Sequence, residues 1–228
     1  MSQRGSQRIP YTVQVEFRTA SSFLVAYSLN VSRGGLFLET EQEVPIGAAV
    51  MLQFLVPGMG STAAAGHVTW RRGPGSTDGP PGIGIEFEEV PAELGETIDR
   101  LVTSFSGLSI VLVANDRQDR ATLTRSIKSI MSTAQVLQAA DAQMAGNLIS
   151  DDVDLIVVDV DCDQEGALAI LRAAKAMAPP VPTVALATRG MRDAAKAAGA
   201  DEIVPNPPPF TELQLSMVRA LGKPLTVR

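Results

Sequence analysis

The sequence has very few of the residues that form disulfide frameworks and zinc sites. Its 228 residues include one cysteine, Cys162, and one histidine, His67. A single cysteine excludes an intrachain disulfide and favours a reducing compartment, and a lone histidine makes a zinc site unexpected. We expect Cys162 to be a small loop residue and His67 to be a strand residue that faces a neighbour or solvent.

Long apolar runs are also missing. No stretch approaches the roughly 20 apolar residues of a membrane span, and the opening residues MSQRGSQR lack the apolar core of a signal peptide. These two absences predict a cytoplasmic protein without membrane insertion. The formal net charge of -6 argues against a general DNA- or RNA-binding protein, because affinity for a polyanion comes chiefly from clustered lysine and arginine.

The amino-terminal half alternates short strands with turns. Strand patterns cover residues 12–17, 23–29, 35–39, 49–55, 64–71 and 84–88, and a glycine- and proline-rich loop covers residues 73–82. A helical pattern then runs from residue 91 to about Gly107. We predict that residues 1–107 form a small antiparallel β-barrel with a carboxyl-terminal helix.

The carboxyl-terminal half alternates buried strands with helices. Strands are predicted at residues 109–114, 134–138, 153–159, 182–187 and 201–204, and helices at 117–131, 139–149, 164–178, 190–198 and 210–222. This alternation predicts that residues 108–228 form a doubly wound α/β domain with a five-stranded parallel sheet. Asn115, Asp116 and Asp159 follow or end strands, so they are expected to converge at the carboxyl edge of that sheet.

Two short polar segments stand out in the first half. Arg4 and Arg8 are separated by three residues, and Asn30, Ser32 and Gly35 follow one strand hairpin later. Residues 30–35 lie between two apolar strand patterns, which predicts a turn whose polar atoms face outward. The structural alternative is a capped turn beside two solvated arginines.

This paired pattern resembles the motif of PilZ domains, the bacterial receptors for the second messenger cyclic di-GMP. The resemblance implies that Arg4, Arg8, Asn30, Ser32 and Gly35 bind the dinucleotide. An arginine fork matches the N7 and O6 acceptors of guanine and also the phosphate charges. Asn30 and Ser32 offer donors and acceptors, and Gly35 permits a tight turn or close approach.

The likeness to PilZ domains covers about residues 4–106. Arg33 is expected to add a further cation beside the phosphates. Residues 67–70 and 82–87 are similar to the closing strands of the family. Trp70 is interpreted as an aromatic of the barrel wall rather than as a stacking platform.

Residues 108–222 resemble a response-regulator receiver domain, a flavodoxin-like fold that accepts a phosphoryl group on aspartate. Asp116 and Asp159 match acidic positions of that site, and Asp159 would be the acceptor. Three departures predict a degenerate phosphoacceptor site. Asn115 replaces an acidic metal-binding position, Ala187 takes the place of the switch hydroxyl although Thr188 is adjacent, and Asn206 takes the place of the lysine.

Together, the two resemblances imply a non-enzymatic cyclic di-GMP effector that relays the messenger level through a pseudo-receiver domain. We expect no catalytic residue, no metal and no cofactor besides the ligand. A protein partner or self-association through residues 108–228 is expected, because helix 210–222 carries more apolar residues than one core-facing stripe needs. Two alternatives stay open: a phosphorylation-responsive protein that uses Asp159 with the barrel as output, and an adaptor that binds no ligand.

Overall fold

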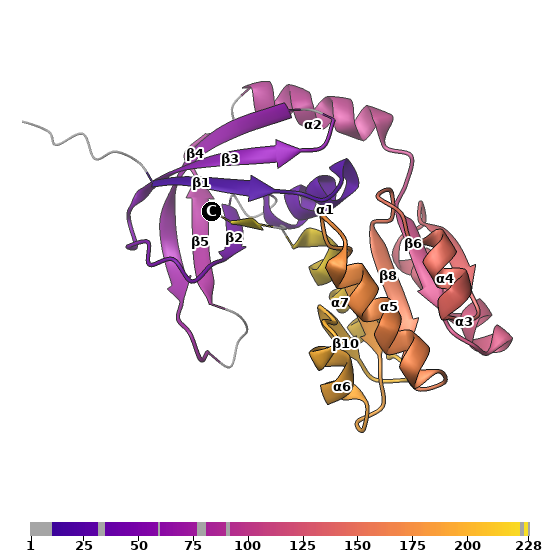
Figure 1. The fold of residues 1–228 in the computed structure, drawn as a ribbon. Helices are drawn as coiled ribbons and strands as arrows, with labels where there is room; N and C mark the ends of the chain where they lie inside the picture. The colour runs from indigo at the N-terminus through magenta and orange to yellow at the C-terminus, as the bar shows by residue number, and fades with distance from the viewer. Residues whose placement is uncertain are drawn as a thin grey trace, which may run out of the picture. The chain divides into compact units, whose positions relative to one another are not determined.

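The chain folds into two compact units, each with its own apolar core (Figure 1). The computed structural model describes residues 11–31, 35–58, 60–76, 81–89, 92–223 and 226–227. The first unit contains Met1–Thr103 and Pro224–Arg228, and the second contains Ser104–Lys223. A separate buried core is the physical property that defines a domain.

A curled six-stranded sheet dominates the first unit (Figure 1). Its strands, in the order β11-β1-β3-β4-β5-β2, are β11 (Thr226–Val227), β1 (Tyr11–Glu16), β3 (Ala49–Val56), β4 (Gly60–Arg72), β5 (Gly82–Phe87) and β2 (Gly35–Glu39). The β1–β3 pair is parallel, whereas the other four pairs are antiparallel. β11 and β2 end the order of the described strands, so the predicted closure into an antiparallel barrel is not confirmed.

The predicted strand at residues 23–29 is wrong, because these residues belong to helix α1 (Ala20–Val31). Thr19 and Ser22 exchange hydrogen bonds at the start of this helix. The Ser22 amide donates to the Thr19 hydroxyl at 3.0 Å, and the Thr19 amide donates to the Ser22 hydroxyl at 3.1 Å. This is a capping-box arrangement, which stabilises the start of a helix. The apolar pattern of this segment is compatible with either a strand or a helix, so the cap favours the helix.

Aromatic packing holds α1 in the core of the first unit. The Phe23 ring meets the Phe17 ring edge to face, with centroids 5.2 Å apart, and lies 6.0 Å from the Phe54 ring. A second helix, α2 (Ala92–Ser104), buries Leu94, Ile98 and Leu101 in the same cluster. The predicted helix at the end of this half is therefore confirmed.

The second unit is a five-stranded parallel sheet in the order β10-β9-β8-β6-β7. The strands are β6 (Ser109–Val113), β7 (Gln135–Ala139), β8 (Leu155–Asp159), β9 (Thr183–Leu186) and β10 (Glu202–Val204). Counted along the chain, this order is 2-1-3-4-5, which is the flavodoxin-like arrangement. All five residues of β8 are buried, as the continuous apolar run predicts.

Helices cover both faces of this sheet (Figure 1). One layer contains α3 (Arg117–Ile130) and α7 (Phe210–Gly222), which contact each other, and the other contains α4 (Ala142–Leu148), α5 (Gln164–Ala176) and α6 (Arg192–Ala197). The predicted sequence of strands and helices is confirmed throughout this unit. Because the strands are parallel, their carboxyl ends lie along one edge, where ligand sites form in such sheets.

Candidate functional site

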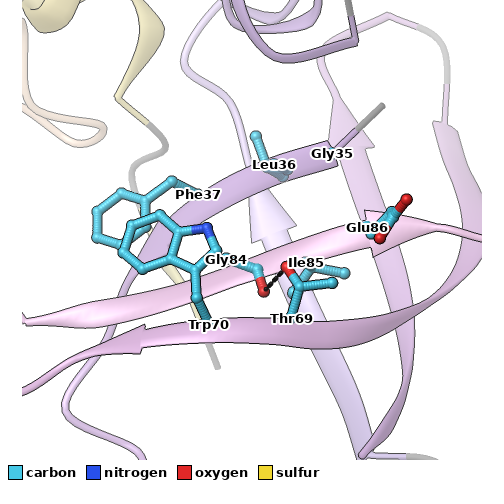
Figure 2. Close-up of a pocket in the computed structure, with 8 residues that line it drawn as sticks. All are labelled: Gly35, Leu36, Phe37, Thr69, Trp70, Gly84, Ile85 and Glu86. Carbon is cyan, nitrogen blue, oxygen red and sulfur yellow. Dashed lines mark hydrogen bonds between the residues drawn. The ribbon is translucent and has the colours of Figure 1, made fainter. Parts of the chain in front are cut away.

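The outward face of β2, β4 and β5 carries a pocket of about 350 Å³ (Figure 2). Strand alternation creates this face. Leu36, Leu38, Ile83 and Ile85 point into the core, so the alternate residues of β2 and β5 point outward. Phe37 pairs with Gly84, and Gly35 pairs with Glu86 across the two strands.

Glycines on β5 make room for two aromatic rings. A Cβ atom on Gly84 would lie 1.9 Å from Nε1 of Trp70, and one on Gly82 would lie 2.5 Å from Cζ of Phe37. Because neither position has a side chain, the indole and phenyl rings lie close against the strand. Figure 2 shows the Trp70 indole in front of β5 at Gly84.

The two rings form a parallel stack. The centroids of Phe37 and Trp70 are 5.0 Å apart and their planes differ by 6°. The Arg72 guanidinium carbon lies 4.8 Å from the Phe37 centroid and 5.5 Å from the Trp70 centroid, within cation–π range of both rings. Trp70 nevertheless stays 43% exposed, so much of the indole remains open to a ligand.

A β-bulge sets the direction of Trp70. The pairing of β4 with β5 shifts between Val68 and Trp70, which leaves Thr69 as the extra residue. The Thr69 hydroxyl donates to the Gly84 carbonyl at 3.2 Å (Figure 2). Farther along β5, the Glu86 carboxylate also lines the pocket, with the His67 imidazole 3.7 Å away.

The second unit has a polar cluster at the carboxyl ends of β8, β9 and β10. The Asn206 amide donates to Asp159 Oδ1 and to Asp161 Oδ2, each at 2.9 Å. The Thr188 hydroxyl and amide donate to the Asp161 carboxylate at 2.7 and 3.0 Å. One neutral amide therefore joins two carboxylates, of which Asp159 is buried.

Two other residues near this edge have altered acidity. The Asp116 carboxylate is the N-cap of α3, and hydrogen bonds from the Asp119 and Gln118 amides lower its pKa. The Cys162 thiol donates to Asp159 Oδ2 at 3.6 Å. Burial raises the pKa of Cys162, and the Asp159 charge raises it further, so this thiol is a poor nucleophile at neutral pH.

Within the part of the chain that the structure describes, histidine, cysteine and carboxylate side chains form no group of three able to hold a metal ion. The helices described there are also too short or too polar to cross a membrane.

A comparison with protein families bears on the first unit. The family model described as PilZ domain matches residues 2–104. Residues 2–104 are therefore similar to PilZ domains. The resemblance predicted from the paired motif is thereby confirmed at the level of the family.

Solved receiver domains resemble the other half of the chain. One is the receiver domain of the DNA-binding response regulator merR from Colwellia psychrerythraea 34H, with 19% identity, a TM-score of 0.45, and coverage of 51% of this chain and 99% of that chain. A receiver domain protein from Clostridium thermocellum has 18% identity, a TM-score of 0.45 and coverages of 50% and 94%. A response regulator from Thermotoga maritima has 18% identity, a TM-score of 0.44 and coverages of 51% and 99%. No curated protein matches the chain.

Most predicted ligand residues of the PilZ domain lie outside the described residues. This holds for Arg4, Arg8, Ser32 and Arg33, and for the side chain of Asn30, whose backbone belongs to α1. Gly35 is described: it begins β2 and lines the pocket. The predicted motif therefore ends at the edge of the pocket in Figure 2.

Gly35 lies where β2 and β5 approach each other closely, so a side chain at this position would not fit. A Cβ atom there would lie 2.3 Å from the Ile85 carbonyl oxygen. Its backbone is not in the left-handed region, in contrast to Gly47, Gly58 and Gly60.

In the second unit, the structure brings together some of the predicted residues. Asn206 donates a hydrogen bond to Asp159, and Thr188 donates one to Asp161. The Asp116 carboxylate instead accepts a hydrogen bond from an amide of its own helix. The Asn115 carbonyl accepts from Arg120 at 2.5 Å. Asp161, which links three strand ends, was not predicted from the sequence.

Sequence reasoning also missed the aromatic stack of the PilZ domain. Trp70 was interpreted as a wall aromatic, and Phe37 and Arg72 were not considered. A usable signal was present, because glycine at alternate positions 82 and 84 of one strand marks a face across which another group lies closely.

We expect Gly35→Ala to destabilise the protein by about 1–3 kcal/mol. The added Cβ would meet a backbone carbonyl, which cannot move without opening the β2–β5 pairing. The free energy of unfolding in urea measures the effect. Gly73→Ala is the matched control, since nothing lies within 4 Å of its Cβ. Equal free energies of unfolding for the two variants would contradict this explanation of Gly35.

We also expect acetyl phosphate or beryllofluoride with Mg²⁺ to leave Asp159 unmodified. Receiver chemistry needs a cation beside the phosphoryl group, and the sequence resemblance predicts neutral Asn206 at that position. In the structure the Asn206 amide donates to Asp159 and Asp161. Intact-protein mass and amide NMR spectra before and after phosphodonor addition measure the outcome. Incorporation at Asp159 at ordinary receiver rates would overturn the prediction.

Proposed function

We propose that the protein is a non-enzymatic receptor for cyclic di-GMP that relays the messenger level through a pseudo-receiver domain. The observation that carries the proposal is the PilZ family match over residues 2–104. In this family the dinucleotide is the ligand, so a signalling role follows from the match. The position of Gly35 beside the pocket supports a ligand site on this face.

The proposed binding residues are Arg4, Arg8, Asn30, Ser32, Arg33 and Gly35. Each arginine can form a bidentate contact with guanine N7 and O6 or pair with a phosphate. Asn30 and Ser32 can then hydrogen-bond the remaining polar atoms of the ligand. The closed PilZ barrel predicted from the sequence remains part of this proposal, as does a cytoplasmic location.

The pseudo-receiver role rests on the polar cluster of the second unit. Asp159 and Asp161 already accept hydrogen bonds from Asn206 and Thr188. Addition of a phosphoryl group would introduce further negative charge with no lysine beside it, which disfavours transfer. We infer that this domain acts through contacts with proteins rather than through phosphotransfer.

The proposed domains are residues 1–107 and 108–228. Two compact units support this division: Met1–Thr103 with Pro224–Arg228, and Ser104–Lys223. The residues of β11 account for this assignment, since Val15 pairs with Val227 and Glu16 with Thr226.

Two exposed apolar side chains of α7 support the proposal of self-association. Leu213, Met217 and Leu221 are buried in the core, so not all of its apolar residues are available. Phe210 is 48% exposed and Leu215 is 50% exposed. We infer that residues 108–228 associate with a second copy of the chain through this helix.

Calorimetric titration of the full chain with cyclic di-GMP tests the ligand. We expect Arg8→Ala to lower the affinity about tenfold or more, because a bidentate arginine–guanine contact contributes about 1–3 kcal/mol. Its melting temperature should change little. Arg100→Ala, on an exposed part of α2, is the control and should bind as the wild type does. Unchanged affinity in Arg8→Ala would remove the motif assignment, and absence of binding by the wild type would favour the adaptor alternative.

Sedimentation velocity of the full chain tests association. We expect a concentration-dependent dimer that Leu215→Glu weakens, since a carboxylate would replace an exposed apolar side chain on α7. Gln214→Glu adds the same charge at the neighbouring exposed position and is the control. A wild-type monomer at all concentrations would mean that the partner is a different protein.

A further inference from the structure

The sheet of the second unit ends with β7, whose outer edge has no partner among the described strands. Proteins usually protect such an edge with charged residues, proline, a β-bulge or a very short strand. The opposite edge follows this rule, because β10 has three residues and begins with Glu202. In contrast, β7 has five residues in unbroken register with β6, and residues 131–140 contain no charge and no proline. The outer edge of β7 is therefore open to another strand.

The hydrogen bonds between β7 and β6 determine which backbone groups point outward. The Gln135 amide donates to the Leu108 carbonyl at 2.7 Å, so Gln135 and every second residue after it face β6. The residues between them, Val136 and Gln138, direct their N–H and C=O groups to the outer edge. Four backbone groups that form strong hydrogen bonds are thus presented in one row.

We propose that this edge pairs with β7 of a second copy of the chain in antiparallel register, which joins the two sheets into one. A two-fold axis at Leu137 places Val136 of each copy opposite Gln138 of the other. Each of these pairs exchanges two backbone hydrogen bonds, so all four outward groups of both strands gain partners. This contact goes beyond the proposed function, which places self-association on α7.

The side chains that meet in this register are compatible. Leu137 lies opposite Leu137 of the second copy, on the face that packs against the second core cluster. Gln135 lies opposite Ala139, and Val136 opposite Gln138. Because none of these residues is charged, no like charges face each other across the two strands.

The charges that flank β7 favour a second copy in antiparallel orientation. The nearest charged residue before β7 is Lys128, in the last turn of α3, and the nearest after it is Asp141, the N-cap of α4. Both side chains are exposed. Antiparallel pairing brings the start of one β7 beside the end of the other, and so brings opposite charges together at both ends. Parallel pairing would instead place like charges side by side.

This edge is a different surface from α7. Helix α7 packs on β8, β9 and β10, whereas β7 lies at the other end of the strand order. A chain that uses both surfaces binds one copy through each and forms assemblies larger than a dimer.

Sedimentation velocity of the full chain tests the edge contact. We expect Leu215→Glu, which weakens the α7 contact, to leave a dimer that forms through β7. Adding Gln138→Pro removes an outward amide but no hydrogen bond to β6, and should raise the dissociation constant of this dimer about tenfold or more. Gln138→Thr keeps the amide and is the matched control, which should dimerise as before.

Disulfide cross-linking of the full chain tests the register. In a Cys162→Ser background, Leu137→Cys places two thiols on the axis with a Cα separation of about 4.5 Å, which a disulfide can span. Gln135→Cys places them about 14 Å apart and is the control. We expect oxidation with copper phenanthroline to link the first variant into a dimer and to leave the second unlinked.

The outcomes separate the edge contact from the α7 contact. A monomeric Leu215→Glu chain, a dimer that Gln138→Pro leaves unchanged, or equal cross-linking at positions 135 and 137 would overturn the pairing of β7. Wild-type dimers that Gln138→Pro dissociates and Leu215→Glu does not affect would support β7 and remove the α7 contact of the proposed function. Circular dichroism establishes that each variant is folded, and if either Gln138→Pro or Leu137→Cys is not, the experiment with the other decides.

Discussion

The outward face that carries the pocket of the first unit depends on the antiparallel pairing of β2 with β5. This pairing places Gly35 opposite Glu86 and Phe37 opposite Gly84, and strand alternation directs all four positions away from the core. Glycine at 82 and 84 then permits the rings of Phe37 and Trp70 to lie against β5. A shift of one residue in register would exchange the outward and core-facing sets, and both the core and the pocket would be lost.

The second unit has a polar cluster at the carboxyl edge of its parallel sheet. Parallel strands bring Asp159, Thr188 and Asn206 to one edge, as they would in any sheet of this order. The Asn206 amide hydrogen-bonds both carboxylates of this cluster. Their acceptor capacity is therefore largely used within the protein. The buried strands, rather than this polar edge, hold the sheet together.

The two sites differ in how far their polar groups are satisfied internally. On the PilZ domain, the Glu86 carboxylate and much of the Trp70 indole remain accessible, which is the condition for binding a ligand. At the edge of the second sheet, each carboxylate of the Asp159–Asp161 pair has protein donors. This contrast supports the proposal that the first unit binds a ligand and that the second contacts proteins.

The sequence by itself determined the likeness to PilZ domains and the strand and helix order of the second unit. These features depend on local motifs and on hydrophobic period, which a sequence displays directly. It did not determine helix α1, because the apolar run of this segment is compatible with both a strand and a helix. The hydrogen bonds between Thr19 and Ser22 favour the helix. Only the tertiary structure showed that Asp161 joins Thr188 to Asn206 and that Phe37, Trp70 and Arg72 stack over two glycines. Glycines 82 and 84 mark the face in the sequence, but the residues that meet there come from different strands. Their partners are set by register and by a β-bulge, which the sequence does not display.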